Sequence, residues 1–397
     1  MSNTQKKNVP ELRFPGFEGE WEEKKLGENA IIKGRLGWKG LKQSEYLEKG
    51  YAYLIANKHI NSGHINWEKA DQISRYRYEE SPEIALEKGD LIFSKDGALG
   101  NPALINNLTK PATINSTMML VRLDQKNFSS IFFYQILLGP LFNKLIYLKV
   151  SGSSIPHLFQ ADMKEFKFNA PPLIEQQKIG KFFSKLDRQI ELEEQKLELL
   201  QQQKKGYMQK IFSQELRFKD ENGKDYPEWE ETTIKEIAQI NTGKKDTKDA
   251  ITNGSYDFYV RSPIVYKINT FSYEGEAILT VGDGVGVGKV FHYVNGKFDY
   301  HQRVYKISDF KNYYGLLLFY YFSQNFLKET KKYSAKTSVD SVRKDMIANM
   351  KVPRPIYIEQ KKIGQFIKKV DNKTKIQKQV IELLKQRKKA LLQKMFI

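Results

Sequence analysis

The chain has 397 residues, with 65 Lys and Arg against 47 Asp and Glu, so its formal net charge is +18. Its 40% hydrophobic and 13% aromatic residues are enough to build two or three folded domains, which excludes a disordered basic tail. The absence of cysteine excludes disulfides, cysteine-type zinc sites and thiol catalysis. The positive surplus indicates a polyanionic partner, either nucleic acid or an acidic membrane face.

No early stretch of the sequence has the apolar core of a signal peptide. The longest apolar run, residues 313–322, is about half of what a membrane-spanning helix needs. The run 131–148 is broken by Gln135, Gly139, Pro140, Asn143 and Lys144. We therefore expect a cytoplasmic protein.

An internal repeat dominates the sequence. Residues 175–212 and 359–396 are identical at 18 of 38 positions, without a gap. The sequence Glu-Leu-Arg-Phe also occurs twice, at residues 11–14 and 215–218. Each half thus runs in the order short lead-in, long variable region, long helix.

Prolines mark the start of each repeated helix: Pro171 and Pro172 in the first half, Pro353 and Pro355 in the second. Apolar residues with a period of 3.5 over about five heptads then predict a coiled coil. A parallel pair in register stays open, but a tandem repeat favours an antiparallel pair with Glu194 near Lys378. The alternative is two unrelated surface helices. The residues predicted to line the seam are Phe183, Leu186, Ile190, Leu197, Leu200, Ile367, Val370, Ile381, Leu384 and Leu391.

The variable regions are rich in predicted strands, because short apolar or alternating runs lie between turn signals. Residues 89–100 and 275–284 parallel one another with one extra residue, which predicts two related α+β domains. Each region also carries an amphipathic stretch, residues 128–148 or 310–327, followed by a small polar loop.

Motifs for catalysis or metal binding are weak or missing. The glycines at 282, 284, 286 and 288 do not fit a nucleotide-binding motif and favour a tight loop between strands. His59 and His64 lack a nearby carboxylate, which disfavours a metal site. No nucleophile elbow, acidic nuclease cluster or adenine-methyltransferase motif is found. The sequence therefore predicts a binding protein without catalytic residues and without a metal or cofactor of its own.

Polar loops at corresponding places in the two halves are the candidate nucleic-acid contacts, because Lys, Arg, Asn, Gln and Ser bind phosphates and read base edges. For any single residue, an ordinary solvated surface role is at least as good an interpretation. In the first half the candidates are Lys33, Arg35, Trp38, Lys39, Lys42, Lys58, His59, Lys95, Ser151, Ser153 and Ser154. In the second half they are Lys244, Lys245, Arg261, Gln302, Arg303, Lys336, Thr337 and Ser338.

Taken together, these features resemble the specificity subunit of type I restriction-modification enzymes over essentially the whole chain. The resemblance rests on Pro-Pro-Leu-Ile-Glu-Gln-Gln-Lys-Ile at 171–179 and its echo Ile-Glu-Gln-Lys-Lys-Ile at 358–363. Ser-Gly-Ser-Ser at 151–154 and Gly-Asp-Leu-Ile-Phe-Ser at 89–94 add to it. The split proline pair of the second half departs from the first copy and affects only where the second helix begins.

The resemblance implies an α+β protein with two related target-recognition domains, separated by two long helices that form an antiparallel coiled coil. Each domain would read one half of an asymmetric, bipartite site in double-stranded DNA, with an unread gap between the halves. Two modification subunits would dock on the chain and carry restriction subunits with them. S-adenosylmethionine, ATP and magnesium would bind those partners, and no membrane is involved. The implied segments are a lead-in (1–20), recognition domain 1 (21–170), spacer helix 1 (171–213), recognition domain 2 (214–353) and spacer helix 2 (354–397).

Two other functions remain as alternatives. A basic coiled-coil scaffold could bind membranes or other proteins, but it would not explain duplicated strand-rich domains. A stand-alone DNA-modifying enzyme is disfavoured by the missing motifs.

Overall fold

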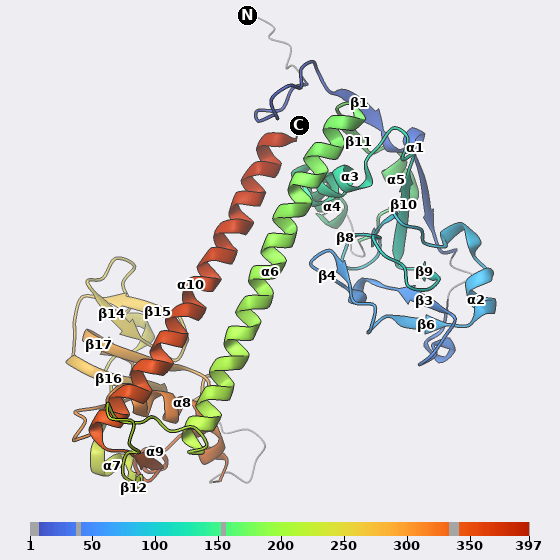
Figure 1. Cartoon of the computed structure of the whole chain (residues 1–397). Coiled ribbons are helices and arrows are strands. Elements are labelled where there is room, and N and C mark those ends of the chain that lie inside the picture. The colour runs from blue at the N-terminus through green and yellow to red at the C-terminus, as the bar shows by residue number, and fades with distance from the viewer. Residues whose placement is uncertain (1–7, 37–40, 152–155, 333–340, 397) are drawn as a thin grey trace, which may run out of the picture. The chain divides into compact units, whose positions relative to one another are not determined.

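The computed structural model describes residues 8–36, 41–151, 156–332 and 341–396 (Figure 1). It divides into two compact units, each of which combines one variable region with parts of both long helices. Unit 1 comprises residues 1–194 and 379–397, and unit 2 comprises residues 195–378. Both mix helices with sheets, as predicted.

The two long helices are α6 (Leu173–Phe212) and α10 (Tyr357–Met395). They run antiparallel within each unit. In unit 1 the start of α6 meets the end of α10, where Lys388 is paired with Asp187 at 2.6 Å. In unit 2 the end of α6 meets the start of α10, where Lys204 is paired with Asp371 at 2.5 Å. These pairs occupy equivalent positions of the repeat, and the predicted antiparallel coiled coil is confirmed.

The expected partner of Glu194 was wrong. Glu194 is paired with Lys385 at 2.6 Å rather than with Lys378. The register in unit 1, which sets Asp187 against Lys388, brings this part of α10 beside Glu194.

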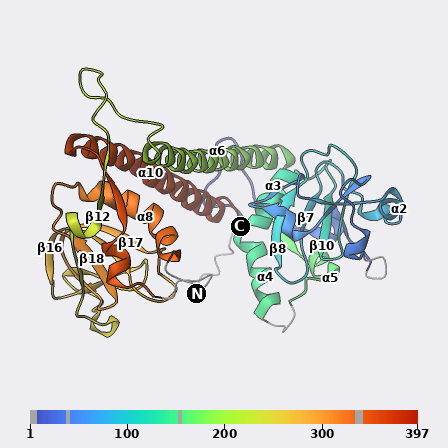
Figure 2. The same cartoon turned by 90° about the horizontal axis from the view of Figure 1, so that it is seen from below.

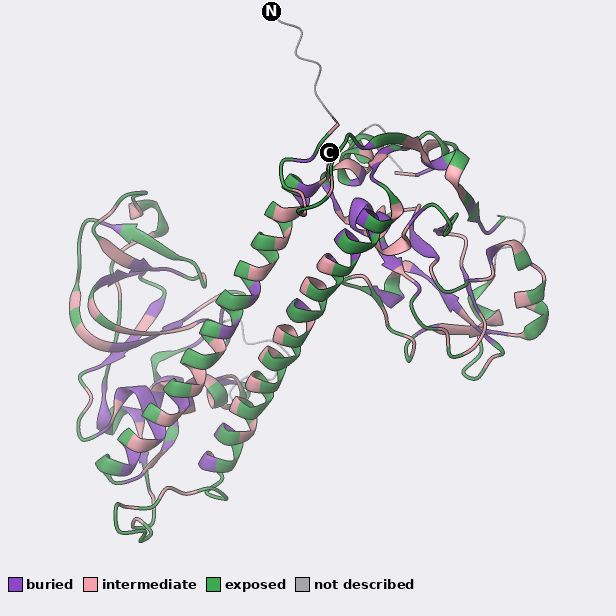
Figure 3. Cartoon of the chain, turned by 45° about the horizontal axis from the view of Figure 1, so that its top comes forward, coloured by how far each residue is buried: buried purple, intermediate pink, exposed green. Residues whose placement is uncertain are grey.

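The predicted seam residues are buried or half-buried and lie among exposed residues in the sequence. Figure 3 shows buried, intermediate and exposed residues alternating along both long helices. Burial is complete or nearly so for Phe183, Ile190, Ile367 and Ile381. The others are half-buried: Leu186, Leu197, Leu200, Val370, Leu384 and Leu391.

Unit 1 contains a four-stranded antiparallel sheet in the order β2-β10-β7-β8 and a three-stranded sheet in the order β6-β3-β9. The strands of the larger sheet are β2 (Ala30–Gly34), β7 (Leu91–Ser94), β8 (Gly100–Leu104) and β10 (Met118–Leu123). Those of the smaller sheet are β3 (Ala52–Ile55), β6 (Asp71–Ile73) and β9 (Ala112–Ile114). A short hairpin joins β4 (Ile60–Asn61) to β5 (His64–Ile65). The helices are α1 (Leu26–Asn29), α2 (Arg75–Glu79), α3 (Ser130–Leu138), α4 (Pro140–Ser151) and α5 (Gln160–Lys164).

Unit 2 is built around one six-stranded sheet, ordered β13-β18-β16-β17-β14-β15, with α8 packed against it (Figure 2). Its strands are β13 (Gln239–Thr242), β14 (Tyr256–Tyr259), β15 (Val265–Ile268), β16 (Tyr273–Val281), β17 (Phe291–Tyr300) and β18 (Val304–Ser308). Its shorter helices are α7 (Ile234–Ile237), α8 (Gly315–Lys331) and α9 (Lys344–Ala348).

Each variable region is closed by pairing its first strand with its last. In unit 1, β1 (Glu22–Lys25) pairs with β11 (Lys167–Ala170). In unit 2, β12 (Glu230–Thr233) pairs with β19 (Lys351–Arg354). The chain therefore enters and leaves each region at one place, next to the start of a long helix.

The end of each long helix completes a hydrophobic core. In unit 1 the ring of Phe396, just beyond α10, stacks on Phe132 of α3 with centroids 5.2 Å apart. In unit 2 Phe212, the last residue of α6, contacts Tyr321 of α8 at 5.1 Å. Phe212 and Phe396 are equivalent in the repeat, so an equivalent ring contacts a helix of the variable region in each unit, edge-on in unit 2 and stacked in unit 1.

The repeated Glu-Gln pair at the start of each helix binds the lead-in and the proline segment. The Arg13 guanidinium donates two bonds of 2.7 Å to the Glu175 carboxylate, whose side chain is fully buried. Gln176 donates to the carbonyl of Pro171 at 2.8 Å and accepts from the backbone N–H of Ser129 at 3.0 Å. These contacts fix the first turn of α6 against both the lead-in and α3.

The second copy makes the same contacts. Arg217 donates to the buried carboxylate of Glu359 at 3.1 Å. Gln360 donates to Pro355 at 2.7 Å and accepts from the backbone N–H of Tyr314 at 2.7 Å. The repeated sequence therefore encodes a repeated set of buried polar contacts.

Among the described residues no single helix is long and apolar enough to cross a membrane. Helices α3 and α4, which meet at a bend of 50°, satisfy the length and composition criteria only as a pair. In this structure Phe132, Phe133 and Ile136 of α3 belong to the core of unit 1.

Replacing Arg13 by alanine should destabilise unit 1 by about 3 to 5 kcal/mol, because it leaves a buried carboxylate without its counter-charge. Urea unfolding followed by tryptophan fluorescence measures this loss. The control is Lys24→Ala, which removes a pair with Glu22 on the exposed surface and should change little. An Arg13→Ala chain as stable as the parent would contradict the structural role of the buried pair.

Candidate nucleic-acid interface

The two variable regions share an Asp-Gly turn at the end of a buried strand. It comprises residues 95–97 after β7 in unit 1 and residues 282–284 after β16 in unit 2. The glycines at 97 and 284 have φ angles of 70° and 78°, in the left-handed region that favours glycine. The glycine of the turn therefore has a left-handed φ in both halves.

In each unit, a segment from the equivalent place in the sequence anchors the turn. In unit 1, Asp96 forms a β-bridge with His157, and the carbonyl of Lys95 accepts from the N–H of Leu158 at 2.9 Å. In unit 2, Asp283 bridges Ser341, and the carbonyl of Gly282 accepts from Val342 at 2.7 Å. In sequence, each anchoring segment follows the polar loop that the sequence singles out.

In unit 2 the aspartate of the turn forms ion pairs with two predicted arginines. Arg261 donates to the Asp283 carboxylate at 3.1 Å, and Arg303 lies 3.7 Å from the same carboxylate. Arg261 follows β14, whereas Arg303 lies in the turn between β17 and β18. Three loops that are distant in sequence thus meet at one surface.

A second carboxylate holds the neighbouring side chains. Gln302 donates its amide to Asp246 at 3.2 Å, and the ring of His301 lies 3.7 Å from the same carboxylate. The backbone of Lys245 accepts from the N–H of Gln302 at 2.8 Å. Lys244, next in the chain, is exposed. The structure therefore brings together five predicted residues: Lys244, Lys245, Arg261, Gln302 and Arg303.

His301 is the buried support of this surface. Its Nδ1 accepts from the backbone N–H of Arg303 at 2.9 Å, and the backbone N–H of His301 donates to the carbonyl of Tyr259 at 2.9 Å. Burial lowers the pKa of His301, although the Asp246 carboxylate opposes that shift. A neutral imidazole keeps the Nδ1 lone pair available to hold the turn.

In unit 1 the predicted residues are more scattered. Lys95 is paired with Asp96 at 3.1 Å, and the ring of His157 is hydrogen-bonded to the same carboxylate. Lys33 is exposed on β2, the strand that carries Gly34, and Gly34 lies against the Lys95 side chain. Ser151 is exposed at the end of α4.

Two further predicted lysines are exposed elsewhere in unit 1. Lys42 precedes a short 3-10 turn at residues 43–45. Lys58 is paired with Asp71 of β6 at 2.8 Å, in the part of the domain built on the three-stranded sheet. No described contact joins either side chain to the Asp-Gly turn.

Two predicted contacts point inward, and their assignment as surface residues was wrong. Arg35 is 4% exposed and donates to the carbonyl of Ile114 at 3.1 Å. His59 is 3% exposed, and its Nδ1 accepts from the backbone N–H of Ala56 at 3.0 Å. Burial lowers the pKa of both side chains. They hold loops of the domain together.

Seven other predicted residues lie outside the described part of the chain, and their assignment stays a prediction. These are Trp38, Lys39, Ser153, Ser154, Lys336, Thr337 and Ser338.

Four members of the site were not predicted from the sequence: the acidic residues Asp96, Asp246 and Asp283, and also His157. A search for cations alone passes over them. The signal was present, because an aspartate precedes the glycine in both copies of the turn.

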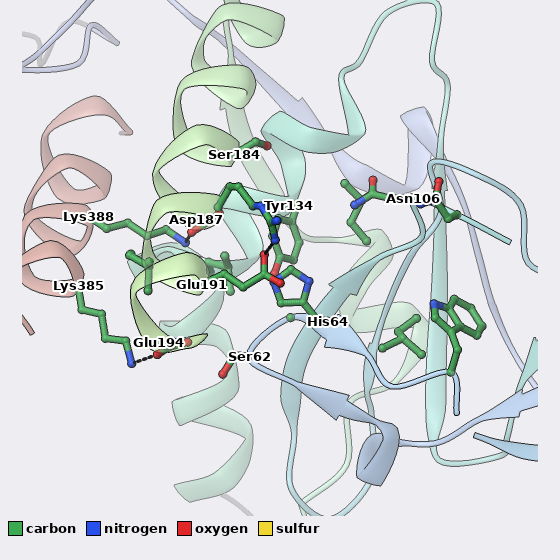
Figure 4. Close-up of a pocket in the computed structure, with 18 residues that line it drawn as sticks. Ser62, His64, Asn106, Tyr134, Ser184, Asp187, Glu191, Glu194, Lys385 and Lys388 are labelled. Carbon is green, nitrogen blue, oxygen red and sulfur yellow. Dashed lines mark hydrogen bonds and ion pairs between the residues drawn. The ribbon is translucent and has the colours of Figure 1, made fainter. Parts of the chain in front are cut away.

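A cavity of about 540 Å³ lies in unit 1, between the β4–β5 hairpin, α6 and the end of α10 (Figure 4). Its charged side chains bond with one another, as in the pairs Asp187–Lys388 and Glu194–Lys385. Tyr134 lines it, and burial raises the pKa of its phenol. In the described ranges no three His, Cys, Asp or Glu side chains come together as metal ligands would. The arrangement suits a joint between domain and helix rather than a reaction site.

Comparison with known proteins gives the family. Residues 18–202 and 226–386 each match the type I restriction modification DNA specificity domain. The chain belongs to this family. The two matches correspond to the two halves of the internal repeat.

The chain resembles curated relatives along most of its length. It is 26% identical to the type I restriction enzyme MjaVIII specificity subunit of Methanocaldococcus jannaschii, over 99% of this chain and 96% of that one. It is 22% identical to the putative type I restriction enzyme MjaX specificity subunit of the same organism, over 84% and 83%. The resemblance stated from the sequence is confirmed. The predicted function, sequence-specific DNA recognition that directs a restriction-modification system, is confirmed as well.

Two solved structures share the fold. One is the S subunit of a type I restriction-modification system from M. genitalium, with a TM-score of 0.66 and 17% identity over 98% of this chain and 99% of that one. The other comes from a structure concerned with assembly of the type I restriction-modification system, with a TM-score of 0.53 and 17% identity over 97% and 98%.

Replacing Arg303 by alanine should weaken DNA binding by the full chain and reduce the slope of log affinity against log salt by about 1, because one phosphate-neutralising charge is lost. A gel-shift titration between about 50 and 200 mM salt measures both quantities. Lys267→Ala is the matched control, since Lys267 is exposed but paired with Asp257 on β15 and β14. An unchanged slope for Arg303→Ala would remove this side chain from the interface.

Acid should destabilise the second site through His301. Its pKa is lowered on folding, so the unfolded chain takes up a proton near pH 6.5 while the folded chain does not. The stabilisation is present above pH 6.5 and is lost as the pH falls toward the lower pKa of the folded state. His301→Gln should flatten the dependence of the free energy of unfolding on pH between 7.5 and 5.5, whereas the exposed His64→Gln should leave it as in the parent. Equal slopes for the parent and His301→Gln would contradict a buried neutral imidazole.

Proposed function

We propose that this specificity subunit reads an asymmetric, bipartite site in double-stranded DNA, one half with each variable region. The observation that carries the proposal is the duplicated Asp-Gly turn with different neighbours in its two copies. In unit 1 the aspartate of the turn pairs with Lys95 and His157, and in unit 2 it pairs with Arg261 and Arg303. Two equivalent frames that carry different side chains suit two different half-sites.

The long helices support an unread gap between the half-sites. Helix α6 has 40 residues. At about 1.5 Å per residue it is about 60 Å long, which exceeds the 34 to 36 Å of one DNA turn. Recognition surfaces carried by such helices can address major grooves on one face of the duplex and leave the base pairs between them without direct contact.

The chemistry of the system, in this proposal, belongs to other subunits. Two modification subunits bind this chain and supply methyl transfer with S-adenosylmethionine, and restriction subunits that use ATP and magnesium join through them. This chain contributes no catalytic residue and acts in the cytoplasm. The family match and a similar fold in a structure concerned with type I complex assembly support such partners.

Exchanging residues 214–353 for the corresponding region of another family member should change one half of the recognised sequence and leave the other half intact. Each half-site depends on one variable region, so the two exchanges should be independent. Methylome sequencing of cells that express the chimera with its modification subunits reads both halves at once. The reciprocal exchange of residues 21–170 is the control and should change only the other half. A chimera that alters both halves would refute the modular mechanism.

A further inference from the structure

The glycine-rich loop between β16 and β17 displays one apolar side chain beside the candidate interface. Val285 is 93% exposed, the highest value among the large apolar side chains that lie on the surface of the described chain. It directly follows the Asp-Gly turn. A polar residue would be the ordinary choice at such a position, because turn tips are hydrated.

The loop around Val285 is held firmly. The N–H of Val287 donates to the carbonyl of Gly284 at 3.1 Å, and the N–H of Val290 donates to Gly286 at 3.0 Å. The side chains of Val287 and Val290 are buried in the core of unit 2. Val285 is therefore presented on an anchored turn of the chain.

Both arginines of the site border this loop. The N–H of Gly282 donates to the carbonyl of Arg303 at 2.8 Å. On the other side, Gly286 packs so closely against the carbonyl of Arg261 that an added Cβ would lie 3.2 Å from it. The exposed valine thus projects from the same group of loops as the two guanidinium groups.

We propose that Val285 reads a base by apolar contact with the 5-methyl group of a thymine in the second half-site. Thymine is the base that presents a methyl group in the major groove, and small apolar side chains are its usual partners. This inference rests on the proposed function and adds a specificity-determining residue to it.

The first half has a small apolar residue at the same position. Ala98 follows the Asp-Gly turn of unit 1, as Val285 follows that of unit 2, and it is also exposed. Position and polarity class are therefore shared by the two copies, while the size of the side chain differs.

A phosphate contact does not explain Val285, because its side chain has neither charge nor hydrogen-bond donor. A wedge between stacked bases fits less well, since proteins that unstack DNA use longer or ring-shaped side chains such as Phe, Leu, Ile, Met or Pro. A methyl-to-methyl contact matches the size of valine.

The experiment pairs a protein change with a base change. The recognised sequence is first obtained by methylome sequencing of cells that express the parent chain with its modification subunits. The purified complex of the same subunits is then titrated against duplexes in which each thymine of the second half-site is replaced, one at a time, by uracil, which removes only the methyl group. We expect one replacement to weaken binding of the parent about fourfold, the value of one buried methyl group. Val285→Ala should bind the thymine duplex about fourfold more weakly and be indifferent to that replacement.

Val265→Ala is the matched control, because Val265 is a partly exposed valine of β15 in the same unit. It should respond to uracil as the parent does, and thermal unfolding should show both variants folded. The inference is overturned if Val285→Ala keeps the parent's sensitivity to every replacement, or if the second half-site contains no thymine on either strand. A parent chain that directs no methylation to a bipartite site would instead refute the proposed function, so the two failures are distinguishable.

Discussion

Neither long helix can bury its apolar stripe alone. The rest of the structure depends on the surfaces against which the two helices bury these stripes. An isolated amphipathic helix in water gains too little from its own hydrogen bonds and needs a partner surface. Here the end of α10 fills the core of unit 1 beside α3, and the end of α6 fills the core of unit 2 beside α8. Each half of the sequence therefore finishes the hydrophobic core of the other half. Two domains consecutive in sequence would describe the chain poorly, because each compact unit takes residues from both halves.

The repeat allowed much of this architecture to be predicted from the sequence. An equal helix in each half predicts an antiparallel pair in which one set of contacts is used twice. Asp187 with Lys388 and Asp371 with Lys204 are that set. The partner of Glu194 was missed because a heptad pattern fixes which face of a helix is buried, whereas the axial register depends on packing at the helix ends. Phe396 on Phe132 is such an end contact, and no local pattern reveals it.

The candidate interface was less predictable, because loop position in sequence does not determine whether a side chain reaches the surface. Arg35 and Lys33 are two residues apart, yet Lys33 is exposed and Arg35 satisfies its guanidinium inside the domain. The convergence of Arg261 and Arg303 on Asp283 depends on strand order, since β18 pairs with the end of β16. Strand order is a property of the tertiary structure and cannot be predicted from short-range turn signals.

Because carboxylates at both turns pair with the nearby cations, the net charge of +18 overstates the positive charge available at the candidate interface. Between residues 359 and 396 there are 12 basic and only 3 acidic side chains, so half of the surplus lies in the second long helix. The turns, by contrast, pair their cations with aspartates and give up part of the attraction to phosphate. If the proposed interface binds DNA, a carboxylate paired with two arginines restricts their rotamers before DNA arrives, and it repels a backbone phosphate placed wrongly. Such a surface sacrifices general affinity for geometric discrimination, which is the balance that a subunit responsible for sequence choice requires.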